Sequence, residues 1–217
     1  MKNTIYIFSG LGTDERVFQK LIFENVNIIF IQWIPPRKDE SLEKYSFRIA
    51  NQINSENPIF VGLSFGGMVA VEVSKIIKAK KLLLIATAKG KNEIPFYFRF
   101  FGKTGFHKLI PSRVFKCANL FTYWFFGIDS EFEKKLLKQI LLDIDPTFLK
   151  WAIDKIVKWE NKTILQNSIH IHGSKDRILP LKFVHCDVTI KDGGHFMTMN
   201  KDFELNEIIQ SELELIQ

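Results

Sequence analysis

Short apolar runs recur along the chain, and each is followed by residues that favour turns. Six of these runs have the length and composition of β-strands, at residues 4–10, 26–36, 57–64, 80–88, 167–174 and 186–194. The first four are almost continuously apolar rather than alternating. That pattern is typical of strands that are buried on both faces of a parallel sheet.

Helical periodicity fills the intervals between the first four runs. Apolar residues recur at helical spacing in 14–24, and helices are also predicted at 41–54 and 66–79. Strand and helix therefore alternate, which indicates right-handed βαβ crossovers. The predicted fold class is α/β, with a mostly parallel sheet of about six strands and helices on both of its faces.

The alternation stops after Ala88. Residues 89–161 contain Phe-rich and charged stretches but no convincing strand, and the strand pattern resumes near Ile169. We therefore expect an inserted helical cap at 89–161 on a core formed by residues 1–88 and 162–217. No Gly/Ser-rich linker separates the two parts, so the cap should pack against the sheet rather than swing freely.

The composition is that of an ordinary globular domain. At 217 residues, of which 46% are hydrophobic and 25% charged, the chain is long enough for one well-buried domain. The formal net charge is +6, but the lysines are spread along the chain and form no basic run. Zinc-finger spacing and aromatic RNA-binding motifs are also absent from the sequence, so we expect no nucleic-acid partner.

The cysteines and the N-terminal segment bear on the cellular compartment. Cys117 and Cys186 lie far apart in apolar surroundings, so buried thiols are predicted rather than a disulfide, which agrees with a reducing cytoplasm. The segment MKNTIYIFSGLG predicts a first buried strand rather than a signal peptide. No apolar run reaches the roughly 20 residues that span a bilayer, so no integral membrane segment is expected.

Candidate chemistry begins at Ser64, in the segment GLSFG. This Gly-x-Ser-x-Gly pattern stands where a buried strand gives way to a helix, and in that context it indicates a nucleophilic serine. A serine on so tight a turn takes a strained backbone conformation, and side chains at positions 62 and 66 would collide with neighbouring backbone. The turn would also direct the N–H of Phe65 and the helix N-terminus toward a developing oxyanion.

The turn at Ser64, which we call the elbow, and the strand and helix on either side of it resemble the α/β-hydrolase superfamily. The resemblance extends over residues 1–88 and 165–217 but not over the cap. A serine needs a base and an orienting acid to act as a nucleophile, and that family places them in the order Ser, acid, His. The segment GSKDRILP resembles the acid loop of the family and GGHF its histidine loop. The resemblance therefore assigns the acid to Asp176 and the general base to His195. The stretch between them is short for the family and leaves room for about one turn of helix, so a trimmed sheet edge is expected.

A glycine-containing loop after the first strand supplies a second oxyanion N–H in the same family. The matching loop here is FSGLG at residues 8–12, so the resemblance assigns Leu11, together with Phe65, to the oxyanion hole. The family often has His-Gly where this chain has Ser9-Gly10. The geometry of the loop is expected to be kept, whereas the role of that histidine is lost.

The remaining histidines and several acids are given structural interpretations. His170 and His172 share one strand face, and with Asp176 nearby they allow a metal site, but a structural role is favoured. No metal and no other cofactor is expected. His107 and His185 are interpreted as surface or packing residues. Alternatives for the triad acid are Asp143, Asp145 and Asp154, while Asp192 is interpreted as a loop residue.

The cap is rich in aromatic residues mixed with basic ones. Most of the aromatic residues are expected to form a core between cap and sheet, and some to line the cleft over Ser64, which favours an apolar acyl or aryl group in the substrate. Lys103, Lys108, Arg113 and Lys116 are interpreted as solvated charge, with attraction of an anionic group or an acidic membrane as the alternative. The aromatic residues in question are Phe96, Phe98, Phe100, Phe101, Phe106, Phe115, Phe121, Trp124, Phe125 and Phe126.

Together these features predict a serine hydrolase that cleaves a small-molecule carboxylic ester or thioester through an acyl-enzyme on Ser64. Acyl transfer or carbon–carbon bond hydrolysis on the same triad remains an alternative, because one fold hosts many chemistries. A binding protein of this fold with little turnover is a further alternative. The sequence leaves open whether the chain forms a homodimer.

Overall fold

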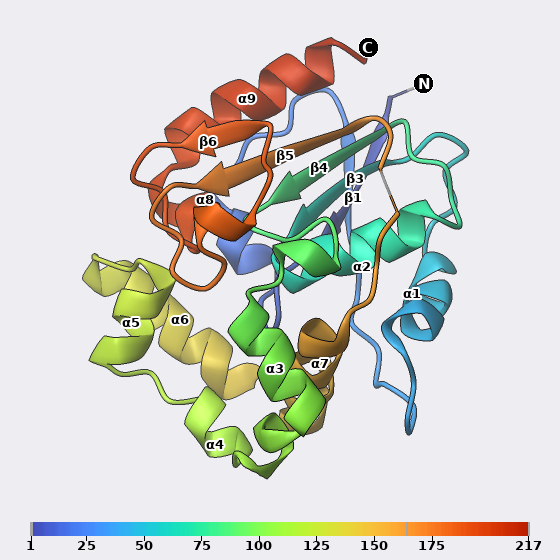
Figure 1. Ribbon diagram of the computed structural model, residues 1–217. Helices are drawn as coiled ribbons and strands as arrows, with labels where there is room; N and C mark the ends of the chain where they lie inside the picture. Colours follow the sequence, from blue (N-terminus) through green and yellow to red (C-terminus); the bar gives the residue numbers. More distant parts are fainter. Residues whose placement is uncertain (1, 164, 217) are drawn as a thin grey trace.

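The computed structural model describes residues 2–163 and 165–216. Within these residues six strands form one sheet in the order β2-β1-β3-β4-β5-β6, and each neighbouring pair is parallel (Figure 1). The predicted α/β sheet is therefore confirmed. The strands are β1 (Thr4–Phe8), β2 (Asn27–Phe30), β3 (Ile59–Leu63), β4 (Lys81–Ile85), β5 (Ser168–Gly173) and β6 (Val188–Ile190).

Helices cover both faces of the sheet, as expected. Successive residues of a strand point to opposite faces, so Ile5 and Ile7 of β1 join one apolar cluster while Tyr6 and Phe8 join another. The first cluster includes residues of the 3-10 helix η1 and of α9, and the second includes residues of α1 and α2. These elements are η1 (Glu15–Phe18), α1 (Leu42–Ala50), α2 (Phe65–Ser74) and α9 (Asp202–Glu214).

Two predictions for the N-terminal part are wrong. The strand expected at 26–36 is only β2, and it is not buried on both faces, because it lies at the edge of the sheet, where Ile28 and Ile29 are exposed. The helix expected at 14–24 is reduced to the single 3-10 turn η1, and the Asp14 side chain caps it by accepting the N–H of Arg16.

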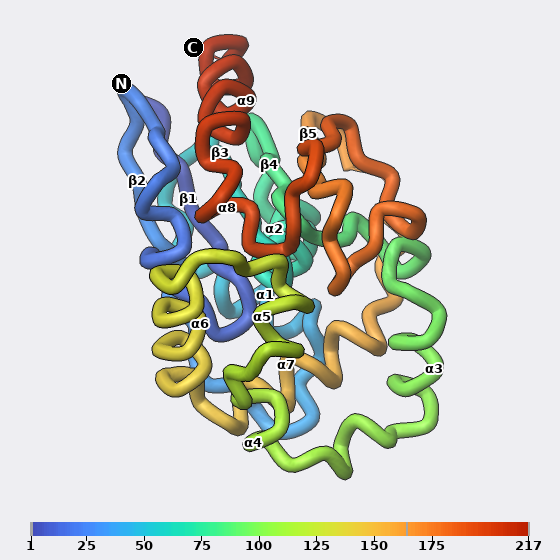
Figure 2. Tube along the Cα trace, turned by 90° about the vertical axis from the view of Figure 1, so that its left-hand side faces the viewer, coloured from blue at the N-terminus to red at the C-terminus, as the bar shows by residue number. Residues whose placement is uncertain are grey.

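Five α-helices lie between β4 and β5 in the described part of the chain, and we call them the cap helices. They lie beyond the carboxyl ends of the strands, on the side of the molecule away from α9 (Figures 1 and 2). We propose that residues 89–161 are an insertion in the sheet core, because all of them fall between two neighbouring parallel strands. The cap helices are α3 (Phe96–Thr104), α4 (Ser112–Phe115), α5 (Leu120–Phe126), α6 (Glu131–Asp143) and α7 (Pro146–Lys158), with the 3-10 helices η2 (Lys91–Glu93) and η3 (Phe106–Leu109).

The cap helices differ in how they contact the core. Leu137 and Ile140 of α6 and Phe148 of α7 are buried in the two apolar clusters of the sheet. The prediction that most cap aromatics form a core is wrong, because α6 and α7 supply most of that core and only a few aromatic side chains of α3 and α5, such as Phe98 and Phe126, pack against it. None of the ten aromatic residues named above is buried, and six of them are exposed, namely Phe96, Phe100, Phe101, Phe106, Phe121 and Trp124.

The connection from β5 to β6 is as short as predicted. Its helical content is the 3-10 turn η4 (Leu181–Phe183), and the chain after β6 continues through the short α8 (Met197–Asn200) into α9. Cys117 and Cys186 are free thiols, as expected. They are not buried, because Cys117 is exposed and Cys186 is half-buried. Among the described residues, no helix combines the length and the apolar character needed to cross a membrane.

The buried centre of the sheet yields a stability prediction. Ile7 is fully buried in β1, so Ile7→Ala removes apolar contacts and leaves a cavity, and we expect a loss of about 2–5 kcal/mol of unfolding free energy. Urea unfolding followed by circular dichroism measures this loss. Ile28→Ala on the exposed edge strand is the matched control, with an expected change of about 0.5 kcal/mol or less. Equal losses for the two variants would contradict the burial of β1 between two helical layers.

Candidate active site

Ser64 lies on the sharp turn between β3 and α2. Its backbone has φ 51° and ψ −121°, a region in which non-glycine residues are strained. The N–H of Ser64 donates to the carbonyl of Ile85 on β4 at 3.0 Å, and its own carbonyl accepts from Gly67 at 2.9 Å, where α2 begins. The strand ladder and the helix therefore fix the serine from both sides.

Close backbone contacts explain the two glycines that flank Ser64. A Cβ on Gly62 would lie 2.5 Å from Cα of Gly67, and a Cβ on Gly66 would lie 2.1 Å from the carbonyl oxygen of Ser9. Both contacts are with backbone, which cannot move aside. The collisions expected from the sequence at positions 62 and 66 are therefore present.

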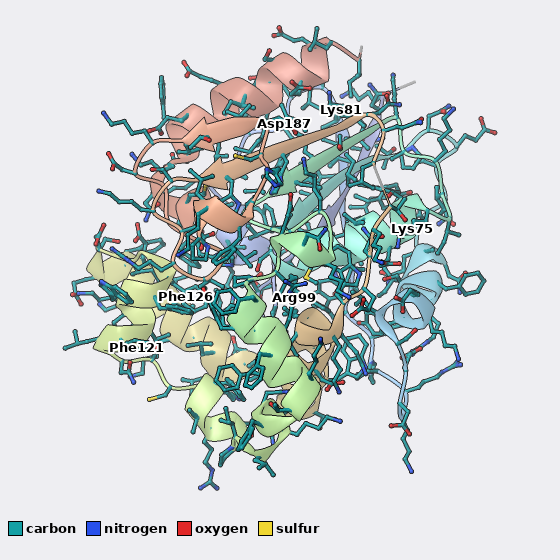
Figure 3. The ribbon with its side chains drawn as sticks, in the orientation of Figure 1. Lys75, Lys81, Arg99, Phe121, Phe126 and Asp187 are labelled. Carbon is teal, nitrogen blue, oxygen red and sulfur yellow. The ribbon has the colours of Figure 1, made fainter. Side chains whose placement is uncertain are left out.

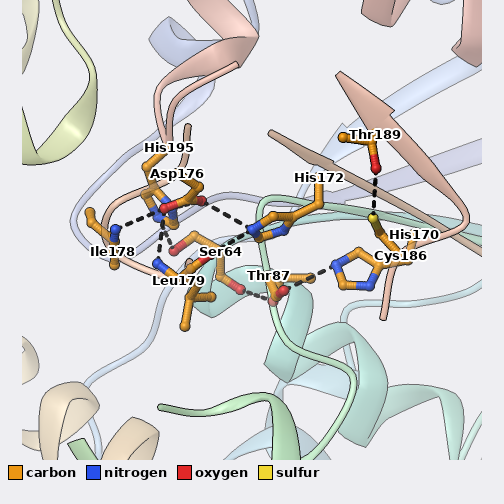
Figure 4. A network of polar contacts seen from close by, with 10 residues as sticks. All are labelled: Ser64, Thr87, His170, His172, Asp176, Ile178, Leu179, Cys186, Thr189 and His195. Atoms are coloured by element: carbon orange, nitrogen blue, oxygen red, sulfur yellow. Dashed lines mark hydrogen bonds and ion pairs between the residues drawn. The ribbon is translucent and has the colours of Figure 1, made fainter. Parts of the chain in front are cut away.

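The structure brings Ser64, His195 and Asp176 together in one hydrogen-bonded row (Figure 4). Ser64 Oγ is 2.8 Å from His195 Nε2, and His195 Nδ1 is 2.7 Å from Asp176 Oδ2. Because a carboxylate only accepts, Nδ1 carries the proton and donates to Asp176, which leaves the Nε2 lone pair for the serine hydroxyl. Ser64 is half-buried, whereas His195 and Asp176 are buried.

Asp176 is held firmly in a loop just past β5. Its Oδ1 accepts the backbone N–H groups of Ile178 and Leu179, each at 2.9 Å. Burial alone raises the pKa of this carboxyl, but the neighbouring charge and hydrogen bond of His195 outweigh burial, so the pKa of Asp176 lies below its usual value. The group is therefore a carboxylate near neutral pH.

The loop after β1 lies beside Ser64. A Cβ added to Gly10 would be 3.6 Å from Cβ of Ser64, which places the next residue, Leu11, at the edge of the same site. Among the hydrogen bonds of the described residues, neither the N–H of Leu11 nor that of Phe65 has an acceptor. Ser9, which stands where the resembled family often has histidine, accepts from Trp33 and donates to the carbonyl of Thr13.

Sequence reasoning missed a polar network beneath Ser64. Thr87, just past β4, donates from Oγ1 to the Ser64 carbonyl at 2.6 Å, and the Thr87 carbonyl accepts from His170 Nε2 at 3.0 Å. His172 Nε2 donates to the Leu179 carbonyl at 2.7 Å and lies 3.5 Å from Asp176 Oδ2. The network joins β4 and β5 to the elbow and the acid loop (Figure 4). The hydroxyl that ends the run KKLLLIATA was the available signal for Thr87.

The two strand histidines are neutral. Burial lowers the pKa of His170 to about 3 and also lowers the pKa of His172. Each uses Nε2–H to donate to a backbone carbonyl, so each ring is engaged as a buried hydrogen-bond donor. Within residues 2–163 and 165–216, no cluster of His, Cys, Asp or Glu is suited to a metal ion.

The other candidate residues lie apart from the row. His107 is buried in the cap, where Nε2 is 2.8 Å from Asp154, and the ring of His185 is exposed. The alternative acids have their own partners: Asp143 pairs with Arg16, Asp145 caps α7 at Phe148, and Asp192 pairs with Lys175. Asp154 also pairs with Lys155 and Lys158. His195 is therefore bonded to Asp176 rather than to any of these acids.

The chain resembles known proteins in its structure rather than in its sequence. No protein-family model matches the sequence, and no curated protein matches it either. A thermophilic esterase from Thermogutta terrifontis matches with a TM-score of 0.70 at 16% identity, over 99% of this chain and 90% of the esterase. An esterase from Exiguobacterium antarcticum matches with a TM-score of 0.72 at 14% identity, over 98% of this chain and 92% of that one. The 2-hydroxy-6-oxo-6-phenylhexa-2,4-dienoate hydrolase from Rhodococcus sp. strain RHA1 matches with a TM-score of 0.66 at 15% identity, over 98% and 91% of the two chains.

The chain has the α/β-hydrolase fold. At such low identity these likenesses establish the fold alone, and the chemistry has to be argued from the side chains of the site. In an α/β-hydrolase fold, as in open parallel sheets generally, sites form beyond the carboxyl ends of the strands. Ser64, Asp176 and His195 lie at those ends, after β3, β5 and β6.

The neutral state of His170 gives a prediction about stability and pH. The unfolded chain binds a proton at this histidine near pH 6.5, whereas the folded protein does so only near pH 3, so folding is favoured above pH 6.5 and loses stability as the pH falls between these values. One such group contributes a slope of about 1.4 kcal/mol per pH unit. His170→Gln keeps a donor to the Thr87 carbonyl but cannot titrate. We therefore expect its unfolding free energy, measured by urea unfolding, to fall less steeply from pH 7 to pH 4 than that of the wild type, by up to about 1.4 kcal/mol per pH unit.

His185→Gln is the matched control for this measurement. His185 is exposed and lies outside the buried network, so this variant controls for the replacement of a histidine as such. If His170→Gln and the wild type lose stability in parallel, His170 is not the buried neutral group described above.

Proposed function

We propose that this protein is a serine hydrolase that cleaves a carboxylic ester or thioester through an acyl-enzyme on Ser64. The observation that carries the proposal is the 2.8 Å contact between Ser64 Oγ and His195 Nε2, on a strained turn whose hydroxyl is half-exposed. A serine hydroxyl is a weak nucleophile by itself and becomes effective when a base at hydrogen-bond distance removes its proton. The similar structures include two esterases, which agrees with ester cleavage.

In the acylation step Ser64 Oγ attacks the carbonyl carbon while His195 Nε2 takes the hydroxyl proton. The carbonyl oxygen becomes an oxyanion, and the histidine becomes an imidazolium with both nitrogens protonated. The imidazolium then gives its Nε2 proton to the departing alkoxide or thiolate, so the leaving group departs as an alcohol or thiol. The acyl group remains on Ser64.

Asp176 acts on this step through His195. Its Oδ2 accepts a hydrogen bond from His195 Nδ1–H, with 2.7 Å between the two heavy atoms. This bond fixes the tautomer in which Nε2 is unprotonated and can accept the proton of the serine hydroxyl. The same carboxylate stabilises the imidazolium once it forms. Because Oδ1 is occupied by two backbone N–H groups, the carboxylate cannot rotate away from the histidine without losing those bonds.

We assign stabilisation of the oxyanion to hydrogen bonds from the backbone N–H groups of Leu11 and Phe65. Phe65 is the first residue of α2, so its N–H stands at the positive end of the helix dipole. Donors fixed in advance stabilise the charge that develops in the transition state, and the loss of one such donor typically reduces kcat about 100- to 1000-fold. Water then attacks the acyl-enzyme, again with His195 as base, and releases the acid.

Apolar side chains around the row suit a small apolar acyl or aryl group. The Phe126 ring, at the end of α5, meets the ring of His195 edge to face at a centroid distance of 5.9 Å. Leu11 is partly buried against the second apolar cluster. We propose a small molecule as the substrate, with no cofactor in the reaction, because the three side chains supply nucleophile, base and acid.

Carbon–carbon bond hydrolysis is the second candidate. The dienoate hydrolase among the similar structures is named for a substrate that contains ketone and carboxylate groups but no ester, so its hydrolysis breaks a carbon–carbon bond. The same serine, histidine and aspartate would serve that reaction or an acyl transfer. A low-turnover binding protein is disfavoured, because a strained serine with a positioned base is not needed for binding.

The first test concerns the serine itself. We expect a fluorophosphonate probe to label the wild type at Ser64, because His195 activates the hydroxyl, and to leave Ser64→Ala unlabelled. Mass spectrometry of the labelled peptide identifies the residue. Ser74→Ala is the matched control, since Ser74 donates to a carbonyl within α2 and has no histidine beside it. An unlabelled wild type would favour the binding protein.

The second test concerns the base and the acid. With p-nitrophenyl and thioester substrates of graded chain length, we expect His195→Ala to lower kcat by about 1000-fold or more. Asp176→Asn should lower kcat by a comparable factor, because it favours the wrong tautomer of His195. Circular dichroism checks that both variants are folded. A His195→Ala protein within about tenfold of the wild type would rule out its role as base.

A further inference from the structure

The outer side of the cap exposes an unusual amount of apolar surface. We call the exposed residues Phe100, Phe101, Phe106, Leu109, Phe121 and Trp124 the apolar face. They lie on α3, η3 and α5, which belong to the cap, on the side of the molecule away from α9 (Figures 1 and 2). Phe121 lies at the outer edge of the cap, whereas Phe126 on the same helix lies closer to the sheet (Figure 3). Clusters of exposed large apolar side chains mark interaction surfaces.

The charge of the same segment has one sign. Residues 94–126 contain five Lys or Arg residues and no Asp or Glu, although the rest of the chain contains charged residues of both signs. In the described part of the protein, Lys103 and Arg113 are exposed and form no ion pair. Lys108 lies 3.7 Å from Asp154, and Lys116 donates to the carbonyls that end α6. The apolar face is thus accompanied by unpaired positive charge.

This combination fits one kind of partner. Exposed aromatic residues on short helices enter the boundary between lipid headgroups and acyl chains, and lysines beside them are attracted to anionic headgroups. A second copy of the chain would bring two positive surfaces together, which disfavours self-association through this face. A nucleic acid would use the charge but would leave most of the phenyl rings in water.

We propose that the apolar face of the cap docks the protein on anionic lipid bilayers. The docked cap would place α5, whose last residue contacts His195, at the lipid surface. The docking does not depend on the proposed hydrolysis, because it rests on the outer side of the cap alone. The two are therefore tested separately.

The test uses full-length Ser64→Ala protein, so that no lipid ester can be cleaved during the measurement. It is centrifuged with vesicles of phosphatidylcholine alone and of phosphatidylcholine mixed with phosphatidylglycerol in about equal amounts. We expect about tenfold or more tighter binding to the anionic vesicles. Binding should weaken strongly at about 0.5 M NaCl, because salt screens the attraction.

Two sets of variants separate the contributions. Phe100→Ser with Phe121→Ser removes two rings that are 63% and 67% exposed, and binding should fall about tenfold or more. Phe47→Ser on α1, at 61% exposure, is the matched control and should bind like the parent. Lys103→Glu with Arg113→Glu should also reduce binding about tenfold or more, whereas Lys78→Glu after α2 should not.

Each other outcome overturns the proposal. Absence of vesicle binding, equal binding to neutral and anionic vesicles, or equal effects of the face and control variants would each refute docking on anionic lipid. Light scattering that shows a dimer, lost in Phe100→Ser with Phe121→Ser, would assign the face to a second copy. Ester hydrolysis by the wild type without vesicle binding refutes docking alone, and vesicle binding by a protein without hydrolysis refutes the proposed function alone.

Discussion

The site depends on a close contact between two backbone segments that are far apart in the sequence. The start of α2 lies so near the end of β1 that a methyl group on Gly66 would overlap the carbonyl oxygens of Phe8 and Ser9. Because the chain must leave β3 and enter α2 within one residue, Ser64 takes a positive φ. The serine hydroxyl and the N–H groups of the loop after β1 are thereby brought to the same edge of the sheet. Close packing of glycine backbone, together with the hydrogen bonds of the Ser64 backbone, sets this geometry.

Much of the fold and the grouping of Ser64, His195 and Asp176 could be predicted from the sequence. In a parallel sheet, the common direction of the strands determines at which edge the residues after each strand lie. Residues that follow buried strands meet at one edge, so Ser64 could be placed there from the strand pattern, and Asp176 and His195 from the resemblance of their loops to those of α/β-hydrolases. The continuous apolar runs of β1, β3 and β4 also gave reliable elements, since strands covered on both faces tolerate few polar residues.

The remaining features depend on neighbours that no local pattern reveals. The run around Ile28 is as apolar as that of β1, but its place at the sheet edge leaves it exposed. The cap aromatics were misassigned for a similar reason, because apolar character does not show whether another layer covers a helix. Thr87 and His170 are polar residues whose partners are backbone carbonyls of Ser64 and Thr87, just past neighbouring strands, and such pairings depend on the sheet register.

Asp176 and His195, the proposed acid and base, are carried by one short segment of the chain. Asp176 and His195 are 19 residues apart and flank β6, the last strand at its edge of the sheet, whereas Ser64 directly follows the central strand β3. Peripheral strands open more readily than central ones, so opening at this margin would release both proton-handling groups at once. Ser64 and the N–H groups proposed for the oxyanion hole would stay in place during such an opening. The proton-transfer part of the proposed site therefore depends on the edge of the sheet, whereas the nucleophile depends on its centre.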